Sequence, residues 1–200
     1  SSWIRTPEFR SFSNISFEDN GKRIAFDISP VNTVLNFYAN NLGFNYDNKG
    51  KIARRGIINH ELLMELNNLE FYKKPFPKSL GFEFVKETIL PLIEKHSISV
   101  EDKMRTFVEH IAMQVENVLG KNLGKLLVTG GGAYNDFLIE RMQFHLPNIK
   151  IIIPNKKTLE YKEALIFALL GVLKLRNETN VLSSVTGAKH DHSSGEIYQD

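Results

Sequence analysis

The chain has 200 residues, of which 42% are hydrophobic and 24% are charged, and its formal net charge is +2. This composition predicts a globular protein of one or two domains, and the scattered lysines and arginines argue against a nucleic-acid-binding surface. No cysteine, signal peptide or apolar run of membrane-spanning length is present, which fits a cytoplasmic protein without disulfides and without a membrane partner.

Residues 1–10 join awkwardly to the sequence that follows, and we interpret them as a leader of artificial origin. In that case the natural protein begins further upstream and the chain is a fragment. The first predicted elements are two short runs of β-favouring residues, Asn14–Glu18 and Lys22–Asp27, on either side of a polar loop that ends in Gly21. This pattern predicts a β-hairpin.

Asp27 is the first candidate functional residue. It is predicted at the carboxyl end of the second strand, ahead of a turn that contains Ser29 and Pro30. Proteins of the α/β class place their chemistry at such strand ends. The alternative is that Asp27 only initiates the turn by hydrogen bonding to its own backbone. A helical pattern follows and stops near Gly43.

The middle of the chain is predicted to be mainly helical. Asn59 can cap one helix. Residues 71–81 contain two prolines and are predicted to be irregular. Lys78 within them is expected to be solvated, and the alternative is that it contacts a phosphate. Residues 82–95 return to helical spacing, which Pro91 would kink or end.

The most regular helical pattern begins after Ser99, which starts a capping box. Apolar residues recur at helical spacing from Met104 to Leu119, and Gly120 stands where a helix would end. We interpret this stripe as core and His110 beside it as structural. The histidines do not pair at ligand spacing on any one helix, so no metal site is predicted.

A strand, a glycine loop and a helix are predicted next. Lys125–Thr129 reads as a buried strand, Gly130, Gly131 and Gly132 follow at once, and Asn135 is placed to cap a helix. Glycines allow a ligand to approach the backbone closely, and a helix start offers free N–H groups, so the unit suits a nucleotide. The alternative is a tight turn that only permits close packing, since the spacing matches neither GxGxxG nor a P-loop.

The last predicted elements are a strand at Ile149–Ile153 and a buried helix at Leu159–Arg176, capped by Thr158. Glu163 near the start of that helix either stabilises the helix dipole or points into a site. Residues 178–200 are polar and predicted to form a surface tail. Residues 11–177 would then form an α/β lobe with a mixed sheet and flanking helices, as in one lobe of an actin-like nucleotide-binding fold.

Five segments resemble, in the same order, motifs of the anhydro-N-acetylmuramic acid kinases. The first is AFDISPVN around Asp27, with YDNKG following it, and the second is FPKSLGFEF. The others are VTGGGAYNDFLIERM, EALIFALLG and LSSVTGA. The resemblance runs from about Phe12 to Ala188 and concerns only the C-terminal half of that family.

The resemblance implies an ATP-dependent kinase of peptidoglycan recycling and amino sugar metabolism with the actin/Hsp70/hexokinase-like (ribonuclease H-like) fold. Such an enzyme hydrolyses the 1,6-anhydro bridge of anhydro-N-acetylmuramic acid and phosphorylates O6, with ATP and Mg²⁺ as cofactors. Asp27 matches the catalytic base, and Gly130–Gly132 match the loop against which adenosine packs. Asn32 and Glu163 match residues on the sugar side of the site.

Two departures from the family shape the expectations. The N-terminal lobe with its phosphate loop is missing, so we expect the chain to be inactive alone and to need that lobe as a partner. The family's GPGN is Ser29-Pro30-Val31-Asn32 here, and the β-branched Val31 resists a positive φ. The alternative is therefore a non-catalytic lobe with weak nucleotide binding and a structural or partner-binding role. Whether the chain forms a homodimer is left open.

Overall fold

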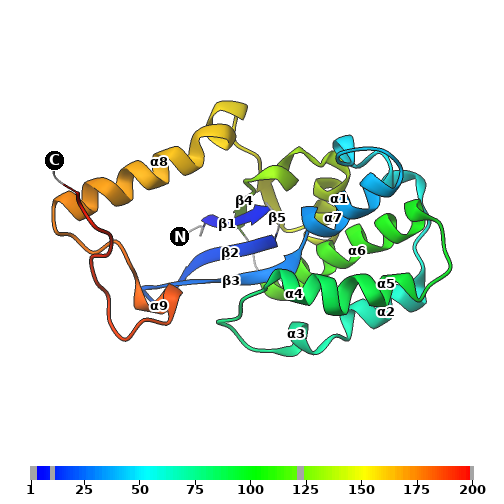
Figure 1. Cartoon of the computed structure of the whole chain (residues 1–200), viewed down its shortest axis with the longest axis horizontal. Helices are drawn as coiled ribbons and strands as arrows, with labels where there is room; N and C mark the ends of the chain where they lie inside the picture. The colour runs from blue at the N-terminus through cyan, green and yellow to red at the C-terminus, as the bar shows by residue number, and fades with distance from the viewer. Residues whose placement is uncertain (1–3, 10–11, 121–123, 199–200) are drawn as a thin grey trace.

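The computed structural model of the chain describes residues 4–9, 12–120 and 124–198. Within these ranges a five-stranded sheet has the order β3-β2-β1-β4-β5 (Figure 1). Its antiparallel part consists of β1 (Ile4–Phe9), β2 (Phe12–Asp19) and β3 (Lys22–Pro30). The other two strands, β4 (Gly124–Leu127) and β5 (Ile149–Ile152), run parallel to β1. This strand order gives the mixed sheet that was predicted for one lobe of an actin-like, ribonuclease H-like fold.

Strand β1 is the main addition to the predicted topology. The hairpin of β2 and β3 is confirmed, but residues 4–9 pair with β2 on one side and with β4 on the other. The segment contains Pro7, and a proline within a run argues against a central strand. No strand was predicted there, because residues 1–10 were interpreted as a leader of artificial origin. The origin of residues 1–10 stays an interpretation.

The prediction that Asp27 ends a strand was wrong, because β3 continues to Pro30. Asn14 pairs with Asp27 while Ser13 pairs with Ser29, so Ile28 is an extra residue in β3. Such a β-bulge bends the strand and re-aims the side chains beside it. Asp27 is therefore placed by a long-range strand pairing and not by a local turn.

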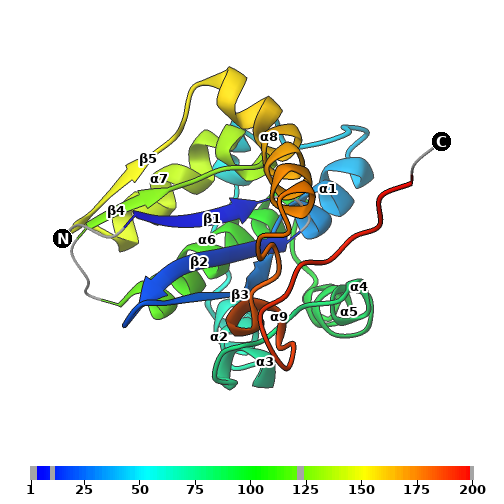
Figure 2. The ribbon, with the colours of Figure 1, turned by 90° about the vertical axis from the view of Figure 1, so that its left-hand side faces the viewer.

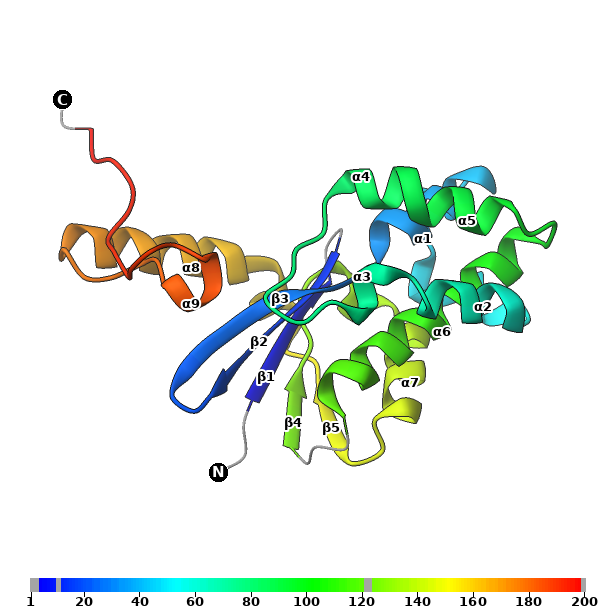
Figure 3. The ribbon, with the colours of Figure 1, turned by 90° about the horizontal axis from the view of Figure 1, so that it is seen from below.

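Helices cover one face of the sheet (Figures 1 and 3). They include α1 (Asn32–Asn41), α2 (His60–Asn67), α6 (Val100–Leu119) and α7 (Asp136–His145). The predicted caps of α2 and α6 are confirmed: Asn59 Oδ1 accepts a hydrogen bond from Leu62 N at 2.8 Å, and Ser99 Oγ accepts one from Asp102 N at 3.1 Å. The apolar stripe of α6 lies in the core.

Two other helices, α8 (Lys156–Leu175) and α9 (Ser183–Thr186), lie on the other side of the sheet (Figure 2). Residues 178–200 were predicted to be a surface tail, but they contain α9 and a bridge between Val181 and His192. No helix in the described ranges has both the length and the apolar content that crossing a membrane requires.

Short helical segments connect the main elements. Residues 71–81 were predicted to be irregular, yet α3 (Glu70–Lys73) extends into them. Pro91 was predicted to kink or end its helix, but α4 (Phe82–Phe84) leads through a π-helical turn at Val85–Ile89 into α5 (Leu90–Glu94). A proline crowds the carbonyl four residues before it, and the wider π turn that precedes Pro91 accommodates this crowding.

His110 is structural, as predicted, and lies fully buried on α6. Its Nδ1 is 2.7 Å from Asn67 Oδ1, and its Nε2 has no hydrogen-bond partner among the described residues. The ring packs against those of Tyr72 and Phe107. Burial lowers the pKa of His110 to about 3, so the folded protein holds this side chain neutral at ordinary pH.

The free energy of unfolding should therefore fall as the solution is acidified below about pH 6.5. The unfolded chain protonates His110 near its ordinary pKa of about 6.5, whereas the folded chain does so only near 3. Between these values the unfolded state binds the extra proton, so stability decreases toward low pH by up to about 1.4 kcal/mol per pH unit. Urea unfolding at about pH 7 and about pH 5 measures the loss. The His110→Gln variant should lose less unfolding free energy on acidification than the wild type. An equal loss in both would contradict the role of His110 in this pH dependence.

Candidate functional site

The glycine loop follows the end of β4. The predicted strand–loop–helix unit is confirmed, although β4 ends at Leu127, two residues earlier than predicted. Gly130 has a φ of +81°, which a residue with a side chain rarely adopts. Gly131 and Gly132 are not among the glycines with positive φ, and they form the one-turn helix η4 (Gly131–Tyr134). Of the three glycines in this loop, only Gly130 has a backbone conformation that requires glycine.

Asn135 caps the helix that follows the loop, as predicted. Its Oδ1 accepts a hydrogen bond from Leu138 N at 3.0 Å, and the side chain is buried. The turn η1 (Asn48–Gly50) rests directly on it: Gly50 has a φ of +71°, and a Cβ there would collide with Asn135 Oδ1 and Phe137 Cβ. Only glycine allows this contact, so η1 and the start of α7 form one wall.

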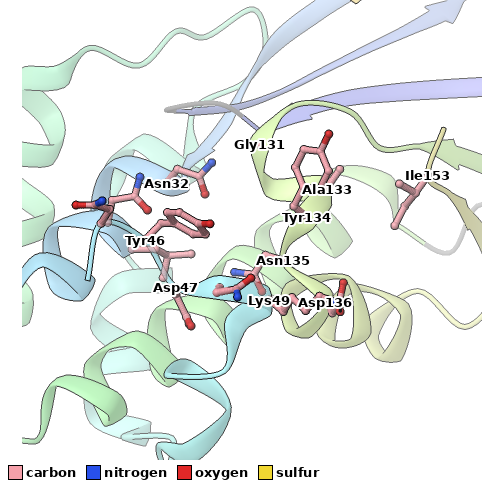
Figure 4. A pocket seen from close by; sticks show the side chains of 14 residues that line it. Asn32, Tyr46, Asp47, Lys49, Gly131, Ala133, Tyr134, Asn135, Asp136 and Ile153 are labelled. Atoms are coloured by element: carbon pink, nitrogen blue, oxygen red, sulfur yellow. Dashed lines mark ion pairs between the residues drawn. The ribbon is translucent and has the colours of Figure 1, made fainter. Parts of the chain in front are cut away.

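A pocket of about 630 Å³ lies between this wall, the glycine loop and α1 (Figure 4). It brings together three of the predicted site residues, Asn32, Gly131 and Asn135. Gly132 is buried next to them. The remaining lining includes Tyr46, Lys49, Tyr134, Asp136 and Ile153. Segments that lie about a hundred residues apart in the sequence therefore meet at the loop that was predicted to bind a nucleotide.

Aromatic and charged groups of this pocket were not identified from the sequence. Tyr46 and Tyr134 are 60% and 46% exposed and lie on opposite sides of the pocket (Figure 4). Lys49 Nζ forms an ion pair with Asp136 Oδ2 at 3.3 Å. Exposed aromatic rings offer faces for a planar base, and a lysine beside a helix N-terminus suits a phosphate. The YDNKG motif was the available signal, because it contains Tyr46 and Lys49.

The loop that carries Tyr46 and Lys49 is held by the carboxylate of Asp47. Asp47 Oδ1 accepts a hydrogen bond from Ile52 N at 2.8 Å, and Oδ2 accepts one from Ala53 N at 3.0 Å. Asp47 is buried, so its charge is directed at these backbone N–H groups. Its role in the pocket is to fix the loop, which leaves ligand contact to its neighbours in the sequence.

Asp27 lies in a second pocket, of about 430 Å³. Pro77, Lys78 and Ser79 form one side of this pocket, and Val185, Thr186 and Gly187 form another. Asp27 Oδ2 accepts hydrogen bonds from Ser79 Oγ at 3.1 Å and from Leu80 N at 2.7 Å. The backbone N–H of Asp27 donates to Lys78 O at 2.9 Å. The pocket therefore unites three segments that the sequence analysis quoted separately, and it fixes the carboxylate of Asp27.

Lys78 is not the solvated side chain that the sequence suggested. Its Nζ donates hydrogen bonds to Phe71 O at 3.2 Å and to Tyr72 O at 3.3 Å, and it lies over the Phe71 ring. Burial lowers the pKa of Lys78 below its usual range. Lys78 thus braces the loop that holds Asp27.

Glu163 lies on α8, and neither of the two pockets includes it. The predicted start of this helix was wrong: Asn155 is the cap, with Oδ1 accepting a hydrogen bond from Thr158 N at 2.9 Å, and the helix begins at Lys156. The helix was also predicted to be buried. In the described structure none of its residues is buried.

Comparison with known proteins assigns the chain to a family. The family model for anhydro-N-acetylmuramic acid kinase matches residues 9–200. The kinase of that name from Aliivibrio fischeri is 34% identical over 195 residues, covering 93% of this chain and 53% of the relative. The one from Sulfurovum sp. is 36% identical over 180 residues, covering 88% and 50%. The chain belongs to the anhydro-N-acetylmuramic acid kinase family and spans about half the length of these curated relatives.

Solved structures with some similarity are more distant. The activator of 2-hydroxyisocaproyl-CoA dehydratase from Clostridium difficile, with bound ADPNP, is 13% identical with a TM-score of 0.47, covering 78% of this chain and 54% of that one. Component A of (R)-2-hydroxyglutaryl-CoA dehydratase from Acidaminococcus fermentans is 13% identical with a TM-score of 0.48, covering 82% and 58%.

Proposed function

We propose that the chain is the C-terminal lobe of an ATP-dependent kinase that opens the 1,6-anhydro bridge of anhydro-N-acetylmuramic acid and phosphorylates O6, in cytoplasmic peptidoglycan recycling. One observation carries this proposal: segments that resemble motifs of the kinase family come together at two pockets in this structure. Asp27 and Asn32 are only five residues apart, yet Asp27 lines one pocket and Asn32 the other. A nucleotide in the first pocket and a sugar in the second would thus share the β3–α1 segment.

Asp27 is the proposed general base. Both hydrogen bonds that the described residues make to this carboxylate use Oδ2, so Oδ1 is the oxygen that would take a proton from water. That water attacks C1 of the anhydro-sugar while the C1–O6 bond breaks, and O6 bonds to the γ-phosphorus as the bond to ADP breaks. The fixed geometry of the carboxylate serves this step, because phosphoryl transfer depends mainly on positioning and charge.

ATP fits the first pocket by its chemistry. The base would stack between Tyr46 and Tyr134, and the phosphates would approach Gly131 and the start of α7. Mg²⁺ in such sites is held largely by phosphates and water, with only one or two carboxylates. In the part of the chain that the structure describes, no group of three or more His, Asp or Glu side chains could hold a metal. The proposed Mg²⁺ would therefore arrive with ATP and neutralise charge on its phosphates.

The sugar side of the site is less complete than the nucleotide side. Glu163 remains a proposed sugar-binding residue, although it lies on α8 outside both pockets. Asn32 was proposed for the sugar but lies in the first pocket, on the β3–α1 segment that the two pockets share. We propose that the second lobe, which the curated relatives have room for in their length, completes this site, and that the chain alone is inactive.

One observation favours the alternative of a non-catalytic lobe. Ser29 and Val31, which replace the family's two loop glycines, are both fully buried. Ser29 Oγ also donates a hydrogen bond to Pro30 O at 3.0 Å. Neither side chain can therefore touch a phosphate. In this chain Val31 has a φ of −130°, so the loop fits valine without a positive φ. A lobe that binds nucleotide without turnover would fit these facts as well.

Gly131→Val should abolish the binding of Mg-ATP to this chain while leaving the fold intact. Gly131 is exposed and lines the first pocket, so the added side chain occupies ligand space without entering the core. Chemical shift changes on titration with Mg-ATP measure the effect. Gly171→Val is the matched control, because a Cβ at Gly171 on α8 meets nothing within 4 Å. Binding that survives in the Gly131 variant would move the nucleotide site elsewhere.

A further inference from the structure

Ser13 carries a fully buried hydroxyl on the core face of the sheet. It lies on β2, two residues before Ile15, and alternate residues of a strand point to the same face. Ile15 belongs to the hydrophobic core, so the Ser13 side chain points toward that core as well. Burying a hydroxyl is costly unless it forms hydrogen bonds. The partners of Ser13 therefore show what the serine does at this position.

Both partners are backbone groups of one residue, Ser29. Ser13 Oγ accepts a hydrogen bond from Ser29 N at 3.1 Å and donates one to Ser29 O at 2.9 Å. The two residues pair in the sheet beside the β-bulge, where Ile28 is the extra residue of β3. A bulge disrupts the ladder of backbone hydrogen bonds between strands. These two hydrogen bonds, here called the Ser13 clamp, join the strands at that disrupted place.

The bulge determines which way the residues after Asp27 point. Asp27 and its partner Asn14 both line the second pocket, on the face of the sheet away from the core. In a regular strand Ser29 would point to the same face as Asp27, because it follows two residues later. The extra residue directs Ser29 toward the core, where it is fully buried and its Oγ lies 3.4 Å from the Tyr72 hydroxyl. The space beside Asp27 thus stays clear of the Ser29 side chain.

We propose that Ser13 is a positioning residue for Asp27, which it places by holding the bulge in β3. The inference rests on the proposed function only for the reaction that Asp27 serves. Without the clamp the bulge can move along β3, and a shift of one residue turns side chains to the other face. The clamp thereby keeps the Asp27 carboxylate on Ser79 and Leu80. It also explains how Ser29 can replace a loop glycine of the family without filling ligand space.

Amide hydrogen exchange in the full chain tests the clamp without any need for activity. The Leu80 N–H donates to Asp27 Oδ2, so its exchange rate reports how often Asp27 leaves its place. The N–H of Phe107, on the buried face of α6, reports the general loosening of the fold. The measured quantity is the Leu80 exchange rate divided by the Phe107 exchange rate, compared between each variant and the wild type.

Ser13→Ala should raise this ratio by about tenfold or more, because it removes two hydrogen bonds from a buried backbone segment. Ser13→Cys should also raise it, because a thiol fills the space of the hydroxyl but is only a weak donor and acceptor. Ile15→Val is the control: it loosens the core beside the same strand and leaves the clamp in place, so it should show the wild-type ratio. A wild-type ratio in either Ser13 variant, or an equal rise in the Ile15 variant, would overturn the proposal.

Kinetics of the chain combined with its second lobe connect the clamp to the reaction. Ser13→Ala should lower kcat by about tenfold to a hundredfold, the effect of a misplaced catalytic group, with KM for ATP nearly unchanged. Full kcat in this variant would contradict the positioning role. The expected exchange ratios without turnover in the wild-type combination would support the clamp and contradict only the proposed kinase function.

Discussion

Asp27→Asn is expected to lower kcat by about a hundred to ten-thousand-fold in the chain combined with its second lobe, with KM for ATP nearly unchanged. Asparagine keeps the shape of the side chain and can still accept the hydrogen bonds from Ser79 and Leu80. It cannot take a proton from water, and loss of a general base has about this effect. ATP is proposed to bind in the other pocket, so the KM for ATP should stay nearly unchanged. Steady-state kinetics with the anhydro-sugar measure both quantities.

The control for this variant is Asp19→Asn at the exposed end of β2, which should retain full activity. Full activity in the Asp27 variant would contradict the catalytic role. Asparagine serves as well as aspartate where only a turn or a hydrogen-bond acceptor is needed. That result would leave Asp27 as a structural residue and favour the non-catalytic alternative.

The second large effect is expected at Glu109, which holds a buried ionic cluster between α6 and α7. Arg141 donates hydrogen bonds from Nε and Nη2 to Glu109, both at 2.8 Å. Arg105 Nη1 donates a third at 2.8 Å, and His145 Nε2 lies 2.7 Å from Glu109 Oε1. Burial alone would raise the pKa of Glu109, but the hydrogen bonds from Arg141, His145 and Arg105 together lower it to about 2.

Glu109→Gln should therefore lower the free energy of unfolding by about 3–5 kcal/mol, because it leaves buried positive charge without its partner. Urea unfolding near pH 7 measures the change. Glu140→Gln is the matched control: it removes the same charge from an ion pair with Arg54 that is about half exposed on both sides, where such pairs contribute little. Equal effects of the two substitutions would show that the Glu109 cluster does not stabilise the fold.

Local patterns predicted the elements that depend on neighbours in the sequence. The caps at Asn59, Ser99 and Asn135 and the hairpin around Gly21 were all correct, because each is a contact over a few residues. Asp27 shows where this reasoning stops. Its environment is made by Ser79 and Leu80, more than fifty residues away, and by a bulge that depends on pairing with β2. Neither the contacts with Ser79 and Leu80 nor the bulge produces a periodic pattern in the sequence, so neither could be predicted from it.

Helix α8 shows a different limit. Its composition correctly indicated a helix, but the predicted burial was wrong, because composition does not say what covers a helix. The pocket residues Tyr46 and Tyr134 show the same limit, because they lie far apart in the sequence and line one pocket in the fold. The resemblance to the family added one further candidate, Asn32, which lines the first pocket.

The most direct test of the whole account is phosphate transfer from ATP to the anhydro-sugar, measured with this chain alone and again after the second lobe is added. The chain alone should show no turnover, because in-line transfer needs ATP clamped between two lobes. Turnover should appear in the combined sample and be lost again with Asp27→Asn. Turnover by the isolated chain at the rate of an ordinary kinase, about 1–100 per second, would contradict the account.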